Sequence, residues 1–479
     1  MWHVNQAYIQ GAWTTVEGTE TINILNPATE AVIGRLTLAS RADARRAIAA
    51  AFAAQPEFGR TTVAERVALL RRLEAALTAH ADAIRDITIE EYGGPVARAQ
   101  WVANYCAQCF AAAAQAVESY AFERRVGDAR VLMAPVGVSA LIAPWNSVAG
   151  TLCSKLASAL AAGCAVVIKP SELGPRQAQV VCEALHAAQL PPGVVNLVIG
   201  RGQDVGDELS TSSQVARISF TGSTATGKHI ARSAVDTMKR VSLALSGKSP
   251  TVVLDDADLV TAIPLAVGAA FTNSGQACVA GSRLLVPRAR MAQALALLHE
   301  SVSALRVGDP RDPATTIGPM MNQAQYDRVQ HYIRRGKEQG AVLLTGGEGR
   351  PEGLPKGFFV RPTVFAEVRN DMDIAREEIF GPVLCVLPYS TEAEAIAMAN
   401  DTPYGLHGYV FSADQARAER VAEQLQAGNV LVNRVVPELQ APFGGVKQSG
   451  LGREFGVFGM ESFLETRSIA VPAAINPSR

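Results

Sequence analysis

The chain lacks the features that mark several large classes of protein. Its 44 Lys and Arg nearly balance 45 Asp and Glu, giving a net charge of −1 with no basic block, which argues against a nucleic-acid partner. The longest apolar runs, such as residues 134–144, are broken by Pro and Gly and fall short of the roughly 18 residues that span a bilayer. We therefore expect a globular protein that binds neither nucleic acid nor a membrane.

Cysteine is also scarce. The seven cysteines show no spacing that suggests pairs, and residues 1–5 lack the basic start and apolar core of an export signal. Unpaired cysteines without such a signal are typical of a reducing compartment, so we expect the cytoplasm. No internal repeat, low-complexity tract or flexible linker is visible, and no metal site is predicted.

At 479 residues the chain is too long for one core, and its texture changes at about residue 136. Before that point, residues 41–54 and 62–92 carry apolar positions at helical spacing. Beyond it, strands are predicted at 138–142, 165–168, 194–199, 217–220 and 241–245, with helices around 155–161, at 175–188 and from 226. A second alternating block covers about 250–435. Such alternation predicts α/β domains with parallel sheets, whose ligands bind beyond the carboxyl ends of the strands.

One cysteine differs from the others in its surroundings. Cys278 follows the small and flexible run Ser274-Gly275-Gln276-Ala277. Such a turn can present a thiol to a substrate, whereas a structural cysteine more often lies in an apolar periodic segment. A free cysteine is also frequently just a small buried hydrophobe, so this turn alone leaves both interpretations open.

Two segments at predicted strand ends favour a dinucleotide site. Gly222, Ser223 and Gly227 lie at a strand-to-helix turn, where free N–H groups and the helix dipole can hold a pyrophosphate, although a purely structural turn fits equally well. Lys169 and Glu172 follow another strand. A carboxylate there can accept hydrogen bonds from ribose hydroxyls and repel a 2′-phosphate, whereas the alternative is a solvated charge pair. Together the segments predict a preference for NAD over NADP.

With Cys278 added, the ordered motifs resemble those of the aldehyde dehydrogenase superfamily along nearly the whole chain. They are Pro144-Trp145-Asn146, Lys169-Pro170-Ser171-Glu172, Phe220-Thr221-Gly222-Ser223, Gly247-Lys248-Ser249-Pro250, Gly275-Gln276-Ala277-Cys278, Glu377-Glu378-Ile379-Phe380-Gly381-Pro382 and Pro442-Phe443-Gly444-Gly445. The resemblance implies a Rossmann-like NAD-binding domain (1–115 and 136–246), a second α/β catalytic domain (247–448), and a small β oligomerisation arm with the C-terminal segment (116–135 and 449–479).

The resemblance also implies roles for individual residues. Cys278 would attack an aldehyde to give a thiohemiacetal, with the developing oxyanion held by the Asn146 amide and the Cys278 N–H. Hydride transfer to NAD would leave a thioester that water hydrolyses. The cofactor would be held by Trp145, Lys169, Ser171, Glu172, Gly222, Ser223, Gly227, Glu378 and Phe380.

The chain departs from the family at Ala244, in Leu243-Ala244-Leu245-Ser246-Gly247. The family usually places its general-base glutamate at this position, and a methyl group cannot accept a proton. We expect Glu454 or Glu438 to act instead. Three alternatives remain: acyl transfer to a thiol such as coenzyme A, an engineered change that traps an intermediate, or an NAD-binding protein without turnover.

The expected substrate tunnel is wide. Its predicted wall consists of Ser147, Thr151, Ser154, Ala277, Val279 and Phe443. Because most of these side chains are small, we expect a bulky, largely apolar aldehyde such as a terpenoid, long-chain or aromatic one. No Arg or Lys lies on residues 147–154, which argues against aldehydes that carry an acid group. The alternative is a helix whose small residues serve only packing.

The chain is expected to form a homodimer or homotetramer. Residues 117–133 and 463–473 are strand-like and fit neither sheet, so they could form an arm that joins subunits. Arg240, Arg453 and Glu465 fall at positions that resemble a charge cluster supporting the subunit interface in the family.

Overall fold

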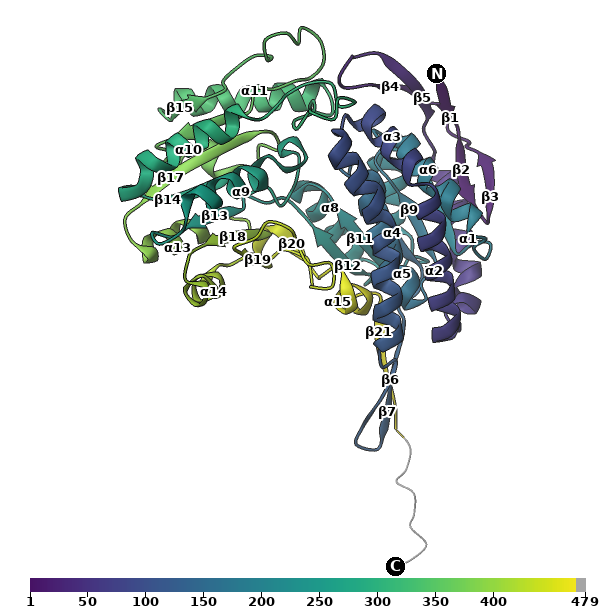
Figure 1. Cartoon of the computed structure of the whole chain (residues 1–479). Helices are drawn as coiled ribbons and strands as arrows, with labels where there is room; N and C mark the ends of the chain where they lie inside the picture. The colour runs from purple at the N-terminus through teal and green to yellow at the C-terminus, as the bar shows by residue number, and fades with distance from the viewer. Residues whose placement is uncertain (471–479) are drawn as a thin grey trace, which may run out of the picture.

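The computed structural model describes residues 1–470, which form two α/β lobes and a projecting arm (Figure 1). The first lobe contains an eight-stranded sheet. Its strands, in spatial order, are β20 (Gly450–Leu451), β12 (Arg240–Ala244), β11 (Arg217–Thr221), β8 (Ser139–Ile142), β9 (Val166–Lys169), β10 (Val195–Leu197), β2 (Gln6–Ile9) and β3 (Ala12–Thr15). The strands from β12 to β10 run parallel, whereas β20 and β2 join them antiparallel.

The central strands of this sheet are apolar because helices cover both of its faces. The β8 sequence Ser-Ala-Leu-Ile and the β9 sequence Val-Val-Ile-Lys are buried at every position, as a doubly covered parallel sheet requires. One face packs against α2 (Val63–Ala79), α3 (Ala81–Ile87), α4 (Val96–Ser119), α5 (Val148–Ala162) and α6 (Pro175–Ala187). The other face packs against α1 (Arg41–Phe58), α7 (Asp207–Thr211) and α8 (Thr224–Val235).

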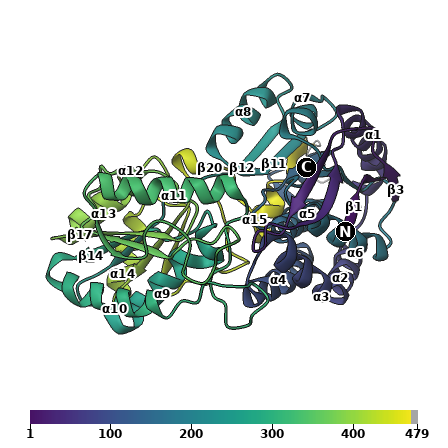
Figure 2. The ribbon, with the colours of Figure 1, turned by 90° about the horizontal axis from the view of Figure 1, so that it is seen from above.

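The second lobe contains a seven-stranded sheet that is parallel except for one edge strand. Its strands, in spatial order, are β15 (Val342–Thr345), β16 (Thr363–Ala366), β17 (Val383–Tyr389), β14 (Arg283–Pro287), β13 (Pro250–Val253), β18 (His407–Phe411) and β19 (Asn429–Val432). Its helices are α9 (Leu259–Phe271), α10 (Met291–Ser303), α11 (Gln323–Glu338), α12 (Asp373–Arg376), α13 (Glu392–Asn400) and α14 (Gln415–Gln424). Seen from above, the two lobes lie side by side (Figure 2).

The α/β architecture and the alternation beyond residue 136 are confirmed. Every predicted strand of the first block is present with closely similar ends; the strand expected at 194–199, for example, is Val195–Leu197. The predicted helices are present too, but the one expected around 155–161 begins earlier, at Val148. The helical stretch predicted at 62–92 is divided between α2, α3 and a short π-helical turn, Thr88–Tyr92. No strand was expected before residue 41, where β2 and β3 join the main sheet and β1 (Trp2–Val4), β5 (Val32–Thr37) and β4 (Thr21–Leu25) form a small separate one.

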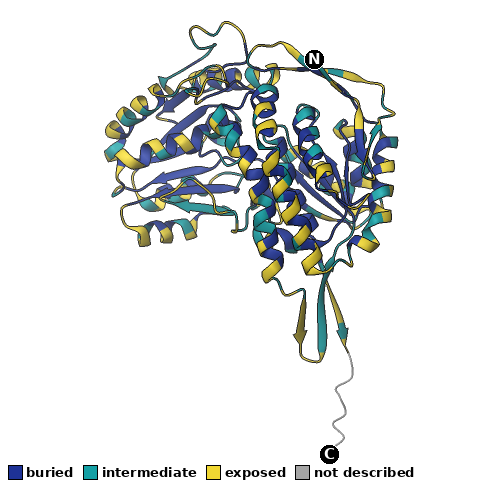
Figure 3. Cartoon of the chain, turned by 45° about the vertical axis from the view of Figure 1, so that its right-hand side comes forward, coloured by how far each residue is buried: buried dark blue, intermediate teal, exposed yellow. Residues whose placement is uncertain are grey.

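The arm consists of three antiparallel strands, β6 (Glu123–Val126), β7 (Ala129–Pro135) and β21 (Leu464–Ala470). It extends from the body and is little buried (Figure 3). The strand predicted over 117–133 begins later than expected, because residues 117–119 continue the Ala-rich helix α4 to Ser119. Of the strand-like segment 463–473, residues 464–470 form β21, and residues 471–473 lie outside the described part of the chain.

Of the three charged residues expected to form a cluster at the subunit interface, Arg240 and Glu465 form an ion pair, and Arg453 contacts backbone carbonyls. Arg240 Nη2 contacts Glu465 Oε1 at 2.6 Å, at the base of the arm. Arg453 instead donates to the backbone carbonyls of Gly445 at 3.1 Å and Gly452 at 2.8 Å. Within residues 1–470, no helix combines the length and apolar character needed to cross a bilayer.

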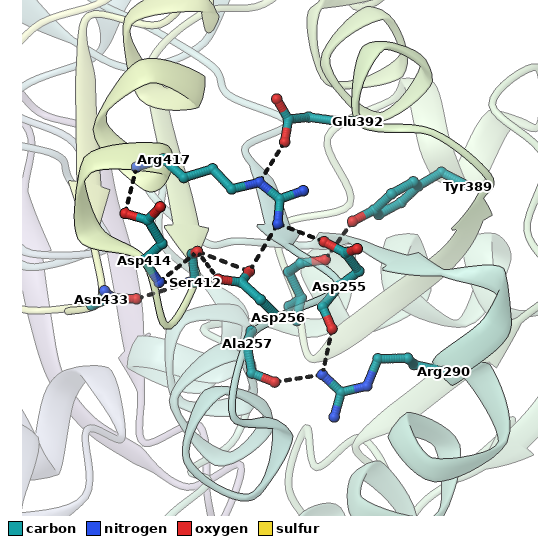
Figure 4. Close-up of polar contacts among 11 residues, drawn as sticks. Asp255, Asp256, Ala257, Arg290, Tyr389, Glu392, Ser412, Asp414, Arg417 and Asn433 are labelled. Atoms are coloured by element: carbon teal, nitrogen blue, oxygen red, sulfur yellow. Dashed lines mark hydrogen bonds and ion pairs between the residues drawn. The ribbon is translucent and has the colours of Figure 1, made fainter.

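A charge network joins the carboxyl ends of three strands in the second sheet (Figure 4). The Arg417 guanidinium contacts Asp255 at 2.7 Å, Asp256 at 3.3 Å and Glu392 at 2.7 Å, and the Ser412 hydroxyl donates to Asp256. These residues follow β13, β17 and β18. The opposite, amino-terminal edge of this sheet is therefore the one left to face the first lobe.

Candidate active site

The site lies where the carboxyl edge of the first sheet meets the amino edge of the second. Asn146 follows β8, Lys169 ends β9, and Ala244 ends β12. From the second lobe, Cys278 precedes β14 and His407 begins β18. The first sheet thus presents its ligand-binding edge, as expected for a doubly wound fold, toward the turn that carries the thiol.

The Cys278 turn has an unusual backbone. Asn273, Ser274 and Gly275 have φ values of 52°, 57° and 74°, the left-handed region that costs non-glycine residues energy. A Cβ on Gly275 would lie 2.3 Å from the Gly381 carbonyl, so only glycine fits there. Ser274 Oγ accepts from the Gly318 N–H at 2.9 Å, which helps to hold the turn in this conformation.

Asn146 and Asn273 hold the last residues of the turn from two sides. Asn146 Nδ2 donates to the Gln276 carbonyl at 2.9 Å, and Asn273 Nδ2 donates to the same carbonyl at 3.0 Å and to the Asn146 carbonyl at 3.0 Å. An amide nitrogen carries two hydrogens, so Asn146 keeps a second donor beside Cys278. Both residues line the cavity that holds the thiol.

The thiol itself is protonated at neutral pH. Its low-polarity surroundings, with a smaller contribution from the Glu378 carboxylate, raise the pKa of Cys278 to about 12. Thiolate, not thiol, is the nucleophilic form, so attack on a carbonyl needs a proton acceptor. Ala244 lines a second cavity, on the nucleotide side of Cys278, and offers only a methyl group.

The structure separates the two glutamates expected to replace this base. Glu454 lines the cavity with Cys278, and its carboxylate accepts hydrogen bonds from Lys155 Nζ and, at 3.4 Å, from Ser219 Oγ. Lys155 Nζ also donates to Ser219 Oγ at 2.9 Å and has no exposed surface. Glu438 is exposed and accepts from the Gln440 N–H at 3.2 Å, and it is absent from the cavity wall.

All six residues expected to form the tunnel line one cavity together with Cys278. The sequence did not predict the other wall residues, which include Arg98, Trp101, Tyr105, His407, Tyr409, Val435, Pro437, Leu439 and Phe455. Arg98, Trp101 and Tyr105 recur at helical spacing in α4, a pattern that predicts a shared face but does not indicate what the face covers.

A long groove continues from this cavity along the first sheet. Its far part is lined by Trp145, Lys169, Ser171, Glu172, Gly222 and Ser223, among others. Lys169 Nζ lies 3.6 Å from Glu172 Oε2 and is buried, and burial lowers its pKa. Ser223 caps α8 by accepting from the Thr226 N–H at 3.2 Å. Gly227 does not line the groove, because its Cα faces the Leu245 side chain, which a Cβ would meet at 2.5 Å.

The near part of the groove joins the nucleotide segments to the thiol. The cavity there is lined by Trp145, Asn146, Ser223, Ala244, Cys278, Glu378 and Phe380, among others. Glu378 Oε1 accepts from the Gly247 N–H at 3.1 Å, and burial raises the pKa of this carboxyl. The Phe380 ring contacts the Trp145 ring edge to face, with 5.4 Å between the ring centres. A carboxylate and an aromatic ring therefore stand beside the thiol at this end.

Comparison with known proteins agrees with this arrangement. The aldehyde dehydrogenase family model matches residues 13–469, so the chain belongs to the aldehyde dehydrogenase family. A Staphylococcus aureus protein of the same family is 46% identical over 464 residues, 97% of this chain and 98% of that protein.

Two solved structures are similar throughout. A Cys-to-Ala variant of aldehyde dehydrogenase C from Pseudomonas syringae, in complex with NAD⁺ and octanal, is 42% identical with a TM-score of 0.97 and 98% of each chain covered. An aldehyde dehydrogenase from Mycobacterium tuberculosis, in complex with NAD⁺, is 37% identical with a TM-score of 0.96, covering 98% of this chain and 99% of that one.

Proposed function

We propose that this protein is an NAD-dependent aldehyde dehydrogenase that converts an aldehyde and water to the carboxylic acid. The observation that carries the proposal is the position of Cys278, at the junction between an apolar tunnel and a groove suited to a dinucleotide. The Cys278 sulfur adds to the aldehyde carbonyl, and the Asn146 amide and the Cys278 N–H stabilise the oxyanion. NAD held in the groove would supply the hydride acceptor, and Cys278 would then carry a thioester that water hydrolyses.

The groove residues fit the cofactor. Glu172 stands at the far end, where its carboxylate can accept from both ribose hydroxyls and repel a 2′-phosphate. The α8 N-terminus, with Gly222 and Ser223, offers free N–H groups to a pyrophosphate in the middle. Glu378 and Phe380 lie at the near end, beside Cys278, where they would hold the nicotinamide ribose and ring.

Glu454 is the proton acceptor that this site offers in place of the family's glutamate. Its carboxylate accepts hydrogen bonds from Lys155 and Ser219, and it shares a cavity with Cys278. Glu454 would take a proton from the Cys278 thiol or from the water that attacks the thioester. Glu438, which is exposed outside the cavity, is the weaker of the two candidates.

A stopped-flow trace of NADH formation tests this function. We expect a linear trace with wild-type protein and an aldehyde, because Glu454 assists deacylation. A burst of about one equivalent per active site followed by slow turnover would mean that deacylation has no base. If coenzyme A then accelerated the slow phase, acyl transfer to a thiol would replace hydrolysis as the function. A protein that binds NAD but forms no NADH with any aldehyde would contradict the proposal.

The tunnel supports a bulky, largely apolar substrate, of the terpenoid, long-chain or aromatic kind. Its wall contains Trp101, Tyr105, Phe443 and Phe455, and the small residues of α5 leave it wide. The Pseudomonas syringae relative binds octanal, an apolar aldehyde, in its crystal structure. Catalytic efficiency for acetaldehyde above that for octanal and benzaldehyde would contradict this substrate class.

The protein is proposed to assemble as a homodimer or homotetramer through its arm, and to act in the cytoplasm. The exposed strands of the arm offer free edges for pairing with another subunit. All seven cysteines are free, as expected in a reducing compartment. Light scattering on size-fractionated protein, with and without residues 123–135, measures the contribution of the arm to assembly.

A further inference from the structure

The apolar tunnel contains one cation without a counter-ion. Arg98, in the first turn of α4, lines the cavity that holds Cys278. Its Nε donates to Asn273 Oδ1 at 3.2 Å, and its guanidinium lies 4.3 Å from the centre of the Trp101 ring. Among residues 1–470, no Asp or Glu side chain forms an ion pair with it. The Nη1 and Nη2 donors of Arg98 are therefore uncommitted to protein.

The other ionisable groups in the wall do not balance this charge. Glu454 is already paired with Lys155, which is fully buried, so the two charges cancel locally. His407 is buried, and burial lowers its pKa to about 4, so the ring is neutral at pH 7. Tyr105, Tyr409 and Cys278 are protonated at that pH, because burial raises the pKa of each. Arg98 thus leaves the tunnel with a net positive charge.

A guanidinium without a counter-ion in low-polarity surroundings raises the free energy of the folded protein, unless a ligand supplies the opposite charge. Arg98 is partly buried, and this burial lowers its pKa because it disfavours the cation. Two parallel N–H groups match the two oxygens of a carboxylate, and such charge-assisted pairs are the strongest hydrogen bonds that proteins form. The Trp101 ring lies against the Arg98 guanidinium and fixes the plane in which its N–H groups point.

An aromatic wall continues from this cation. The Trp101 ring stacks on the Tyr105 ring, with 4.8 Å between the ring centres. The Tyr105 ring contacts the Phe455 ring edge to face, with 6.5 Å between centres. The Phe455 ring in turn stacks on Phe443, with 5.2 Å between centres. A substrate body lying along these rings would be apolar, as the wide tunnel predicts. Its charged end and its aldehyde would have to lie on separate parts of the molecule.

We propose that Arg98 binds a carboxylate on the substrate, so that the aldehydes oxidised here are formyl-bearing carboxylic acids with an apolar or aromatic body. This inference rests on the proposed function and refines it. It revises the expectation, drawn from residues 147–154 alone, that acid-bearing aldehydes are excluded. The product is then a dicarboxylate, formed when Cys278 releases the second acid group.

Matched aldehydes test the proposal. The pairs are 4-formylbenzoate with its neutral methyl ester, and 8-oxooctanoate with octanal. Wild-type protein should show catalytic efficiency roughly 10- to 100-fold higher for the charged member of at least one pair. Arg98→Gln should remove this preference through KM, and Arg98→Lys should restore part of it. Arg434→Gln is the control. Arg434 is exposed and lies next to the wall residue Val435 in the sequence, but it does not line the tunnel, so removing its charge should leave the preference unchanged.

Arg98 also contacts the catalytic turn through Asn273, so a positioning role must be distinguished. If Arg98→Gln lowered kcat equally for charged and neutral members, the guanidinium would support the turn and the proposal would be wrong. A wild-type preference for the neutral members would overturn it as well.

Binding of terephthalate, a dicarboxylate, to the NAD-loaded protein gives a readout without turnover. Calorimetry should show affinity at least about tenfold weaker in Arg98→Gln than in Arg434→Gln. Equal affinities would reject the anion site. Absence of turnover with every aldehyde, while terephthalate binding still depended on Arg98, would reject the proposed function alone.

Discussion

Lys155 donates a hydrogen bond to Glu454 from a position with no exposed surface, although the two residues lie in α5 and near the C-terminus. The contact places a carboxylate and its counter-ion in the wall of the cavity that holds Cys278. Ala244, by contrast, lines the neighbouring cavity on the nucleotide side of Cys278, where it offers only a methyl group.

Glu454→Gln should turn steady NADH formation into a burst followed by slow turnover. The amide keeps the shape of the side chain but cannot accept a proton, so deacylation should slow by about 10²- to 10⁴-fold. Stopped-flow fluorescence measures both phases, and a melting temperature checks that Lys155, left without its partner, does not unfold the protein. Glu438→Gln is the control and should behave as wild type. Linear, fast turnover in Glu454→Gln would assign deacylation to another group.

Alkylation of Cys278 should show no plateau below pH 10. Its pKa is raised to about 12, so between pH 7 and pH 10 the thiolate fraction, and with it the rate of reaction with iodoacetamide, should rise about tenfold per pH unit. Mass spectrometry of the labelled peptide measures the rate in the cofactor-free protein. Cys278→Ser provides the background labelling. A plateau at pH 8 would show that the thiol is already activated in the free enzyme.

Glu172→Gln should weaken the preference for NAD. The neutral amide no longer repels a 2′-phosphate, and Lys169, 3.6 Å from Glu172, is then free to attract one. We expect the ratio of NADP to NAD affinity to rise by roughly tenfold or more. NAD(P)H fluorescence titration measures both affinities. Glu183→Gln, in the first lobe on α6 and outside the groove, is the matched control. An unchanged ratio would mean that another residue rejects the phosphate.

Gly275→Ala should destabilise the protein and slow NADH formation. The residue has φ 74°, and a Cβ would lie 2.3 Å from the Gly381 carbonyl, so we expect a loss of about 1–3 kcal/mol in unfolding free energy. Gly268→Ala, in α9, meets nothing within 4 Å and should stabilise by up to about 1 kcal/mol. Denaturant titration compares the two variants. Equal stabilities would show that the Cys278 turn relaxes without cost.

Much of the fold could be predicted because its strands are short apolar runs between Gly- and Pro-rich turns. The motif residues Asn146, Lys169 and Ser223 could be placed near one another, because parallel strands bring their carboxyl ends to one edge. Gly227 lies in the same motif but packs on Leu245, a contact that depends on how closely α8 approaches its strand.

The contacts between distant segments could not be predicted. Glu438 and Glu454 were equivalent candidates in the sequence, and only the path of the chain shows that one faces the cavity and the other faces solvent. The place of Arg98 in the tunnel could not be predicted, because the sequence of α4 indicates only that Arg98, Trp101 and Tyr105 share one face of the helix. Which element covers that face depends on the packing of both lobes.

The segment that supplies Glu454 also leads into the arm. After pairing with Phe443, the chain passes through one short helix, α15 (Gly456–Glu461), and enters β21 at Leu464. β21 completes the arm, so a displacement of the arm is transmitted to the Glu454 backbone through the short segment that contains α15. If subunits join through the arm and Glu454 is the proton acceptor, as proposed, a subunit whose arm is unpaired would lose the alignment of Glu454 before that of Cys278.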